Sequence, residues 1–434
     1  MTTVDRIELP IVYGGNRKAY LGHDPEVVLA GPADTGKTVA LLTKLHWLAH
    51  KYDNASMVIA RKQLTDTYGT VLQTFQKKII DPTVAVYGGE KAQWYDYPNG
   101  SRVWVAGLDK PGKVLSAEHD LIYVNQCEEL VLPDWETLTT RTTGRAGHIP
   151  YPQVTGDCNP AAPTHWIKSR ARSGSLALFE STHRDNPTIY DPVTGEMTEG
   201  GKARLANLQR LTGSRKQRLF HGLWAVPEGA IYEVFDEERH KVKSFPIPPL
   251  WPRVVGIDPV GAYIAAVWVA YDPRAKVLNV YREYLEPFGI PTSKHAENLL
   301  KLSGYDPSGT PQAGAETIFY WCGGGPSERQ ARLDFQANGI PIQAPGVADV
   351  WAGINQVIEL LDDFRLVVHD CCVNLLSGIG DYRRKMKNGV PTDQIEGKER
   401  FHLPDALRYA ILGPEEQERE EVSYEPVRIG RWQG

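Results

Sequence analysis

The chain has 434 residues, of which 41% are hydrophobic and 23% are charged, a composition typical of a globular protein with two or three domains. No apolar run approaches the ~20 residues that cross a bilayer, and the first ten residues lack an apolar core, so we expect neither a membrane span nor a signal peptide. The net charge of -5 excludes a globally basic nucleic-acid coat, but it permits DNA binding in a local groove of clustered Lys and Arg.

The five cysteines form no CxxC pair, and their odd number argues against a disulfide framework. Cys371 and Cys372 are adjacent within an apolar run, which favours buried thiols. This cysteine usage fits a reducing cytoplasm.

Residues 25–225 alternate between short apolar runs and helical patterns, which predicts an α/β domain with a mostly parallel sheet and helices on both faces. The expected buried strands are residues 27–30, 57–60, 103–106 and 121–124. Residues 38–50 carry apolar side chains at helical spacing and are expected to form a helix. We expect this first domain to extend over residues 1–242.

A phosphate-binding loop follows the first expected strand. Residues 31–38 fit the pattern GxxxxGK(S/T) at every fixed position, between a strand and a helix. Backbone N–H groups of such a loop surround the β-phosphate, Lys37 neutralises β/γ charge, and the Thr38 hydroxyl is a ligand for Mg²⁺ of Mg-ATP. The residues assigned to nucleotide binding are Gly31, Asp34, Thr35, Gly36, Lys37 and Thr38. The alternative is a chance glycine-rich turn.

The strand at residues 121–124 should end in an acid that activates water, yet it is followed by the amides Asn125 and Gln126. Water activation is therefore assigned to either Glu128 or Glu129. The alternative is that both are solvated acids at a helix start.

Polar residues after the next strand are candidates for coupling. Thr155 and Asn159 can sense the γ-phosphate from a strand tip, although Asn159-Pro160 is also a common turn. Arg141 and Arg145 follow the acid pair and are candidates for an arginine finger, with exposed surface arginines as the alternative.

A second pattern begins after residues 243–252, which hold four prolines and are typical of a stiff interdomain linker. We expect a second domain over residues 253–413 and an acidic, mobile tail over 414–434, with five Glu between 415 and 421. The expected strands are 254–258, 263–271, 276–284 and 317–322, and the expected helices include 293–302, 328–338 and 404–411.

Taken together, these motifs resemble the large terminase subunit of tailed bacteriophages. The likeness in the first half comprises the phosphate-binding loop, the strand with its Glu pair, and the segments 155–160, 219–224 and 228–232. In the second half, residues 255–259 and 402–409 look like the first and last acidic motifs of the terminase nuclease. The likeness extends over residues 15–412.

The resemblance implies a P-loop ATPase that pumps double-stranded DNA into a procapsid, followed by a ribonuclease H-like α/β nuclease that cuts concatemeric DNA. It further implies a homo-oligomeric ring, commonly a pentamer, on the portal protein in the host cell cytoplasm. A small terminase subunit selects the DNA. The cofactors implied are ATP with Mg²⁺, and two Mg²⁺ or Mn²⁺ ions at the nuclease site.

Two-metal nucleases gather carboxylates around ions about 4 Å apart. Asp258 ends the first strand of the second domain and Asp405 lies in its last helix, so both are expected to bind metal and act in cleavage. The alternatives are an Asp-Pro turn for Asp258 and a helix-start acid after Pro404 for Asp405.

The Asp that terminase nucleases usually carry at the end of this strand is missing after residues 317–322. We therefore prefer Glu328, which follows the strand, as the third metal ligand over Glu316, which precedes it. Asp381 and His402 are further candidates for metal or outer-shell contact.

Two other functions remain open at this level. One is a P-loop helicase-like nucleic-acid ATPase with a nuclease-inactive second domain, and the other is a nucleotide-binding assembly scaffold without turnover. DNA contacts would be to phosphates. The basic clusters available for them are Lys168/Arg170/Arg172, Arg210/Arg215/Lys216/Arg218 and Arg383/Arg384/Lys385/Lys387.

Overall fold

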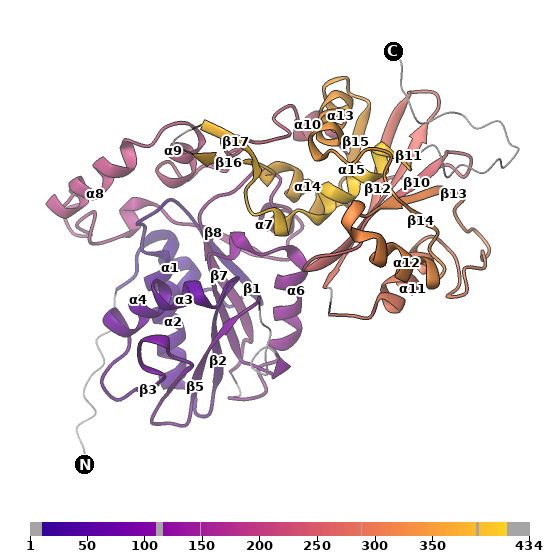
Figure 1. The fold of residues 1–434 in the computed structure, drawn as a ribbon. Coiled ribbons are helices and arrows are strands. Elements are labelled where there is room, and N and C mark those ends of the chain that lie inside the picture. The colour runs from indigo at the N-terminus through magenta and orange to yellow at the C-terminus, as the bar shows by residue number, and fades with distance from the viewer. Residues whose placement is uncertain (1–10, 110–115, 148, 288, 388–389, 415–434) are drawn as a thin grey trace, which may run out of the picture. The chain divides into compact units, whose positions relative to one another are not determined.

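The computed structural model describes residues 11–109, 116–147, 149–287, 289–387 and 390–414. It divides into two compact units, residues 1–228 and 229–434, each with its own sheet (Figure 1). Most of the expected acidic tail, residues 415–434, lies outside the described residues.

The first unit is built on an eight-stranded sheet in the order β3-β4-β5-β2-β6-β7-β1-β8. Its strands are β1 (Glu26–Ala30), β2 (Ser56–Arg61), β3 (Ala85–Tyr87), β4 (Trp94–Asp96), β5 (Arg102–Gly107), β6 (Leu121–Asn125), β7 (Gln153–Cys158) and β8 (Ala177–Glu180). The strands from β5 to β8 in this order are parallel, whereas β3 and β4 add an antiparallel edge. The predicted strands and the mostly parallel sheet are confirmed.

Helices cover both faces of this sheet. The helices described in this unit are α1 (Gly14–Leu21), α2 (Lys37–Lys51), α3 (Thr65–Tyr68), α4 (Val71–Lys78), α6 (Leu132–Arg141), α7 (Trp166–Arg172), α8 (Glu199–Gln209) and α9 (Gly213–Leu219). Consecutive residues of β7 show the two faces: Asp157 contacts Thr38 of α2, whereas Gly156 lies against Trp135 of α6. Helix α2 buries Leu41, Leu45 and Leu48, which recur at helical spacing.

The second unit has a seven-stranded mixed sheet in the order β14-β13-β10-β11-β12-β15-β9. Its strands are β9 (Lys241–Val242), β10 (Arg253–Asp258), β11 (Tyr263–Asp272), β12 (Val277–Pro287), β13 (Ile318–Gly323), β14 (Ile342–Gln343) and β15 (Leu366–His369). β10, β11 and β12 coincide with the three expected strands and form an antiparallel meander, and β13 pairs in parallel with β10. This order agrees with the expected ribonuclease H-like α/β fold. A separate hairpin joins β16 (Arg384–Lys387) and β17 (Val390–Ile395).

The helices of the second unit are α10 (Glu237–His240), α11 (Thr292–Leu302), α12 (Arg329–Ala337), α13 (Val350–Asp362), α14 (Val373–Asp381) and α15 (His402–Leu412). Helix α15, at the yellow end of the colour scale in Figure 1, packs on β10 and β11. Gly256 permits this close approach, because a Cβ there would lie 1.9 Å from the carbonyl oxygen of Ala406. The first turn of α15 therefore lies at the carboxyl end of β10.

The division between the units differs from the expected boundary at residue 242. The chain divides between Glu228 and Gly229, and β9 pairs with β15 of the second sheet. The proline-rich segment belongs to the second unit, where the Arg253 guanidinium donates to the carbonyls of Ile247, Pro248 and Pro249. The segment therefore packs within the second unit and does not form an interdomain linker. The sequence did not predict this, because proline content shows that a segment is stiff but not what it packs against.

All five cysteines are free. Cys372 is buried as expected, but Cys371 is exposed, so the prediction of two buried thiols was wrong for Cys371. The apolar run ends at the strand β15, and Cys371 lies in the turn that follows. Among the described residues no helix is both long and apolar enough to cross a membrane.

Candidate active sites

The phosphate-binding loop connects the end of β1 to α2, as predicted. Asp34 and Gly36 adopt positive φ angles of 60° and 84°. A Cβ at Gly31 would lie 2.4 Å from the carbonyl oxygen of Ser181, so only glycine fits there. The loop thus ends on the N-terminus of a long helix, where backbone N–H groups and the helix dipole favour an anion.

Side chains from outside the loop hold its carbonyl groups. The Asn16 amide donates to Thr35 O at 2.7 Å, and the Asn186 amide donates to Asp34 O at 2.6 Å. The N–H of Ala33 donates to Leu219 O at 3.0 Å, which ties the loop to the end of α9. Sequence analysis missed Asn16 and Asn186, because neither belongs to a motif.

Lys37 is buried at the base of this loop. Its ammonium donates to Gly31 O at 2.8 Å and to Pro32 O at 2.6 Å, and lies 3.5 Å from Asn159 Oδ1. Burial lowers the pKa of Lys37, and the nearby Asp157 carboxylate opposes this shift. A buried cation whose partners are neutral oxygens fits the role of binding a phosphate anion.

Asp157 lies beside the loop and was missed by the sequence analysis. The Thr38 hydroxyl donates to Asp157 Oδ2, while Asp157 Oδ1 accepts from the Asn125 amide and the Gln126 N–H, both at 3.0 Å. A hydroxyl and a carboxylate adjacent to a phosphate-binding loop are the oxygen ligands that Mg²⁺ prefers. Alternation along β7 is the signal that identifies Asp157, because this acid lies near the end of the strand on the face turned toward α2.

Glu128 and Glu129 occupy different environments. Glu128 Oε1 accepts from the backbone N–H of Asn159 at 3.0 Å, whereas Oε2 is buried without a hydrogen-bond partner. Burial raises the pKa of Glu128 to about 7. Glu129 instead lies 3.3 Å from Arg61 Nη2, with 32% of its side chain exposed. The environment of Glu128 is the one suited to a general base near neutral pH.

Of the two coupling candidates, only Asn159 lines the cavity beside the loop. Its side chain lies near both Lys37 and Glu128, at 3.5 and 3.4 Å. Thr155 is fully buried within β7, and its hydroxyl lacks a hydrogen-bond partner. The structure therefore brings Asn159, but not Thr155, to this cavity.

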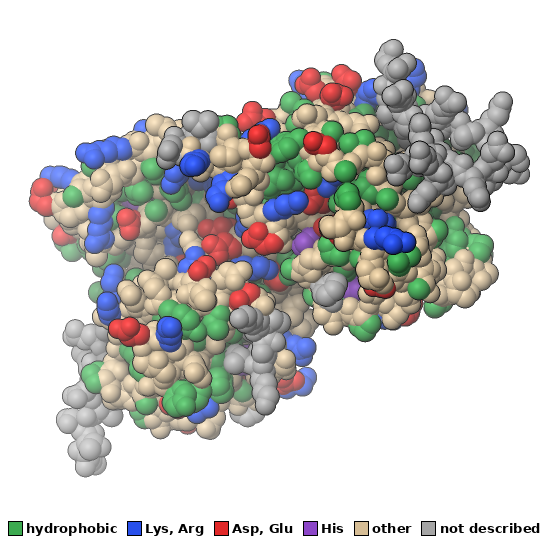
Figure 2. Space-filling model, viewed as in Figure 1, with side chains coloured by type: hydrophobic (Ala, Val, Ile, Leu, Met, Phe, Trp, Pro, Cys, Tyr) green, Lys and Arg blue, Asp and Glu red, His purple; other side chains and the backbone are tan. Residues whose placement is uncertain are grey.

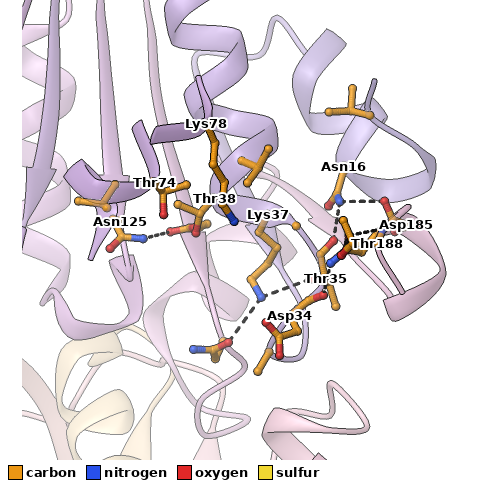
Figure 3. Close-up of a pocket in the computed structure, with 18 of the residues that line it drawn as sticks. Asn16, Asp34, Thr35, Lys37, Thr38, Thr74, Lys78, Asn125, Asp185 and Thr188 are labelled. Atoms are coloured by element: carbon orange, nitrogen blue, oxygen red, sulfur yellow. Dashed lines mark hydrogen bonds between the residues drawn. The ribbon is translucent and has the colours of Figure 1, made fainter. Parts of the chain in front are cut away.

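The cavity has a volume of about 700 Å³, which is in the range of ligand-binding pockets. In Figure 3, Thr74 and Lys78 of α4 lie on the side of Thr38 and Asn125, and Asn16 and Asp185 lie on the other side. Arg61 and Arg204 also line it, so three cations beyond Lys37 surround the cavity. None of the three was identified from the sequence.

Arg141 and Arg145 are not brought to this cavity. Helix α6 carries the chain from the carboxyl end of β6 back to the amino end, where Thr142 bridges to His119 ahead of β6. Both arginines are exposed, and Arg145 pairs with Glu118 at 3.2 Å. Neither can reach the loop of its own chain, because the phosphate-binding loop lies at the opposite edge of the sheet.

The second candidate site lies at the carboxyl end of β10. Asp258 Oδ2 is 2.7 Å from His402 Nδ1, and both residues are buried. Burial raises the pKa of Asp258 to about 6; the His402 hydrogen bond opposes the shift, and the Asp405 and Glu328 carboxylates add to it. The structure therefore brings Asp258, Glu328 and Asp405, which are far apart in the sequence, close enough for their charges to interact.

The other two carboxylates have one hydrogen bond each from a neighbour. Arg408 Nη2 lies 3.3 Å from Asp405 Oδ1, and the N–H of Gly325 donates to Glu328 Oε2 at 2.6 Å. His402 Nε2 is buried without a hydrogen-bond partner. Two buried carboxylates, a half-buried third and an unsatisfied imidazole nitrogen fit divalent cations, which would offset the repulsion between the carboxylates.

Glu316 lies at the opposite end of β13 from Glu328. Its carboxylate pairs with Arg282 at 2.9 Å and accepts from the Tyr281 hydroxyl at 2.8 Å. Asp381 ends α14, which packs on α15. The preference for Glu328 over Glu316 agrees with this placement.

The basic clusters differ in how many of their cations are already paired. Arg170 binds Glu26 in a bidentate pair, Arg383 pairs with Glu396, and Arg384 pairs with Asp393. Lys385 and Lys387 are exposed. On the face shown in Figure 2, Lys and Arg side chains lie in separate groups among acidic ones, and several groups lie over α8 and α9.

No family model and no curated protein matches the chain. Among solved structures, the large terminase of a thermophilic bacteriophage is 18% identical, with 92% of this chain and 98% of that chain covered and a TM-score of 0.43. The HK97 bacteriophage large terminase is 13% identical, with 89% and 90% covered and a TM-score of 0.42. The nuclease domain of the large terminase from the bacteriophage SPP1, with bound Mn, is 18% identical, with 37% and 85% covered and a TM-score of 0.29. These identities and TM-scores are low, so the roles of the residues depend on the geometry of this chain itself.

Proposed function

We propose that the chain is a viral DNA-packaging motor subunit that hydrolyses ATP to translocate double-stranded DNA and cuts concatemeric DNA with a two-metal endonuclease. The observation that carries this proposal is that one chain holds a phosphate-binding loop with a buried lysine and, in its other unit, the buried carboxylates of Asp258 and Asp405 with the half-buried Glu328. The order of the motifs along the chain, described above, supports the packaging role.

In the ATPase site, Lys37 and the N–H groups at the start of α2 bind the β- and γ-phosphates. Thr38 and Asp157 hold Mg²⁺, with Asn125 orienting the Asp157 carboxylate. The ion supplies charge neutralisation of the phosphates when bound. Glu128 accepts the proton of the attacking water at Oε2, and its bond to Asn159 couples this base to the nucleotide.

In the nuclease site, Asp258, Asp405 and Glu328 hold the divalent ions, and His402 orients Asp258. The ions supply Lewis-acid stabilisation of the attacking and leaving oxygens when bound. His402 keeps one Asp258 oxygen engaged, which leaves the other free for a ligand.

The partners proposed are double-stranded DNA, the portal protein of the procapsid, a small terminase subunit, and further copies of the chain in a pentameric ring, in the host cell cytoplasm. In such a ring an arginine of one subunit completes the ATPase site of the next. Arg141 and Arg145 are exposed and unable to serve their own site, so we propose them for this role in trans.

The experiment is a pair of assays on the full chain: ATP hydrolysis with Mg²⁺ and DNA, and nicking of supercoiled plasmid with Mn²⁺. We expect both activities. Hydrolysis without nicking favours the helicase-like alternative, for which the bond of Glu328 to its own Gly325 is the supporting observation. The absence of both activities, in protein that still binds ATP, favours the scaffold.

A further inference from the structure

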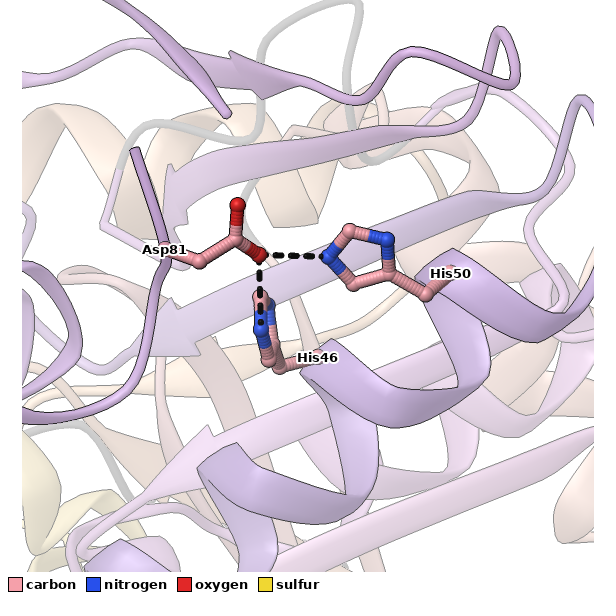
Figure 4. A group of neighbouring side chains, drawn as sticks. All are labelled: His46, His50 and Asp81. Carbon is pink, nitrogen blue, oxygen red and sulfur yellow. Dashed lines mark hydrogen bonds and ion pairs between the residues drawn. The ribbon is translucent and has the colours of Figure 1, made fainter. Parts of the chain in front are cut away.

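A third group of charged and imidazole side chains lies in the first unit, at the end of α2 away from the phosphate-binding loop. His46 and His50 stand one turn apart on α2, and Asp81 comes from the segment after α4 (Figure 4). Asp81 Oδ2 lies 2.8 Å from His50 Nε2 and 3.5 Å from His46 Nε2. One ligand atom of each residue lies within 4.8 Å of the others, and the described residues contain no other such group of three.

A single ion pair does not account for this arrangement. Asp81 Oδ1 is occupied by the N–H and hydroxyl of Thr83, at 2.8 and 2.5 Å, so Oδ2 alone faces both imidazoles. His50 already satisfies that oxygen. His46 is fully buried, and its Nε2 has no hydrogen-bond partner although it faces the carboxylate. Buried polar atoms are normally hydrogen-bonded or bound to a metal, so the unsatisfied Nε2 of His46 indicates a ligand that binds all three residues.

The distances fit a tetrahedral zinc ion. Zinc bonds of about 2.0 Å to nitrogen and oxygen place neighbouring ligand atoms about 3.3 Å apart. The two observed separations, 2.8 and 3.5 Å, lie on either side of that value. Spacing of i and i+4 puts both imidazoles on one helix face, as in helical zinc sites.

The surroundings favour the metal-binding form of the histidines. His46 Nδ1 lies 2.8 Å from the Tyr97 hydroxyl, a partner that can accept Nδ1–H and leave the Nε2 lone pair for a metal. The side chains of His50 and Asp81 are 22% and 18% exposed, which opens the group to solvent.

We propose that His46, His50 and Asp81 form a zinc site with water as the fourth ligand. Imidazole ligands select zinc over Mg²⁺, which prefers oxygen. The site joins two elements that line the nucleotide cavity: α2, which begins with Lys37, and α4, which contributes Thr74 and Lys78. The ion fixes the end of α2 to the segment after α4 and so holds one wall of the cavity in place.

The test is zinc binding to the full chain, measured by equilibrium dialysis in excess Mg²⁺ so that the carboxylate sites are occupied. The variants are His50→Ala and Asp81→Asn, both partly exposed, and the matched control is His23→Ala, an exposed histidine stacked on Tyr151. We expect wild type and control to bind one equivalent of zinc that both variants bind at least about 100-fold more weakly.

Two further measurements make the result specific. The variant Asp258→Asn should keep the zinc equivalent, which separates this site from the nuclease carboxylates. Zinc should raise the melting temperature of the wild type and the control but not of His50→Ala, because only a ligand bound by the folded state stabilises it. Equal zinc binding by wild type and both cluster variants, or no zinc binding by the wild type, overturns the proposal.

Discussion

The two candidate active sites are built in opposite ways. The residues that surround the phosphates come from one continuous segment, residues 31–38, whereas the nuclease carboxylates lie at positions 258, 328 and 405. The first site needs only a strand, a turn and a helix, and the second needs β10, the loop after β13 and α15 to meet. A local site is set by backbone conformation, and a non-local site is set by packing. Substitutions in one site should therefore abolish its activity without affecting the activity of the other site.

The largest expected effect is on the local site. Lys37→Ala removes the buried ammonium, and we expect ATP turnover to fall by about 10³-fold or more because phosphate charge is no longer neutralised. Plasmid nicking should be unchanged. Lys51→Ala, at the other end of α2, is the matched control and should retain turnover. Turnover like that of the wild type in Lys37→Ala would refute the assignment of the loop.

The reverse effect is expected at the non-local site. Asp258→Asn and Asp405→Asn should each reduce plasmid nicking in Mn²⁺ by at least about 100-fold and leave ATP turnover intact, because the charge that holds the ions is reduced. Glu297→Gln, a partly exposed acid on α11, serves as the control. If both variants nick DNA as fast as the wild type, the nuclease site is misassigned.

Asp157 sharpens the comparison, since it is the non-local part of the ATPase site. We expect Asp157→Asn to lower kcat for ATP by about 10- to 100-fold and to raise the Mg²⁺ concentration needed, because Thr38 loses its charged neighbour. Glu129→Gln should change kcat by less than about threefold. Steady-state kinetics over a Mg²⁺ titration measure both effects. A larger loss of kcat in Glu129→Gln than in Asp157→Asn would contradict the assignment of Asp157, and not Glu129, to the ATPase site.

The pH dependence of ATP turnover tests Glu128. Burial raises its pKa to about 7, and the base must be ionised, so activity falls as pH decreases through that value. We expect the single-turnover rate constant for ATP hydrolysis to rise about tenfold between pH 6 and pH 8. A flat profile over this range would contradict the role of Glu128.

The smallest expected change concerns packing beneath the nuclease site. Gly256→Ala places a methyl group against Ala406 O and should destabilise the second unit by about 1–3 kcal/mol. Its melting transition should shift down by about 2–4 °C per kcal/mol, and nicking should weaken as α15 moves. Gly289→Ala, with open space at its Cβ, is the control. An unchanged melting transition would show that α15 accommodates the methyl group.

The sequence predicted what local rules determine. The loop at residues 31–38, the helix that follows it and the strand ending at Asp258 all appear where periodicity and turn chemistry place them. The pairing of Thr38 with Asp157 was missed, because it depends on β7 lying next to β1 in the sheet. The distance of Arg141 and Arg145 from the cavity of their own chain was missed for the same reason, since the sequence does not show that α6 carries them to the other edge. Burial of Glu128 rather than Glu129 likewise depends on Asn159, which follows another strand, β7.

The central claim is that one chain contains two separate centres, a phosphate-binding site and a group of metal-binding carboxylates. One diffraction experiment tests both centres. Crystals of the full chain soaked with Mn²⁺ and a non-hydrolysable ATP analogue should show anomalous peaks beside Thr38 and Asp157, and among Asp258, Glu328 and Asp405. Manganese absent from either group of residues in well-ordered crystals would contradict that half of the account.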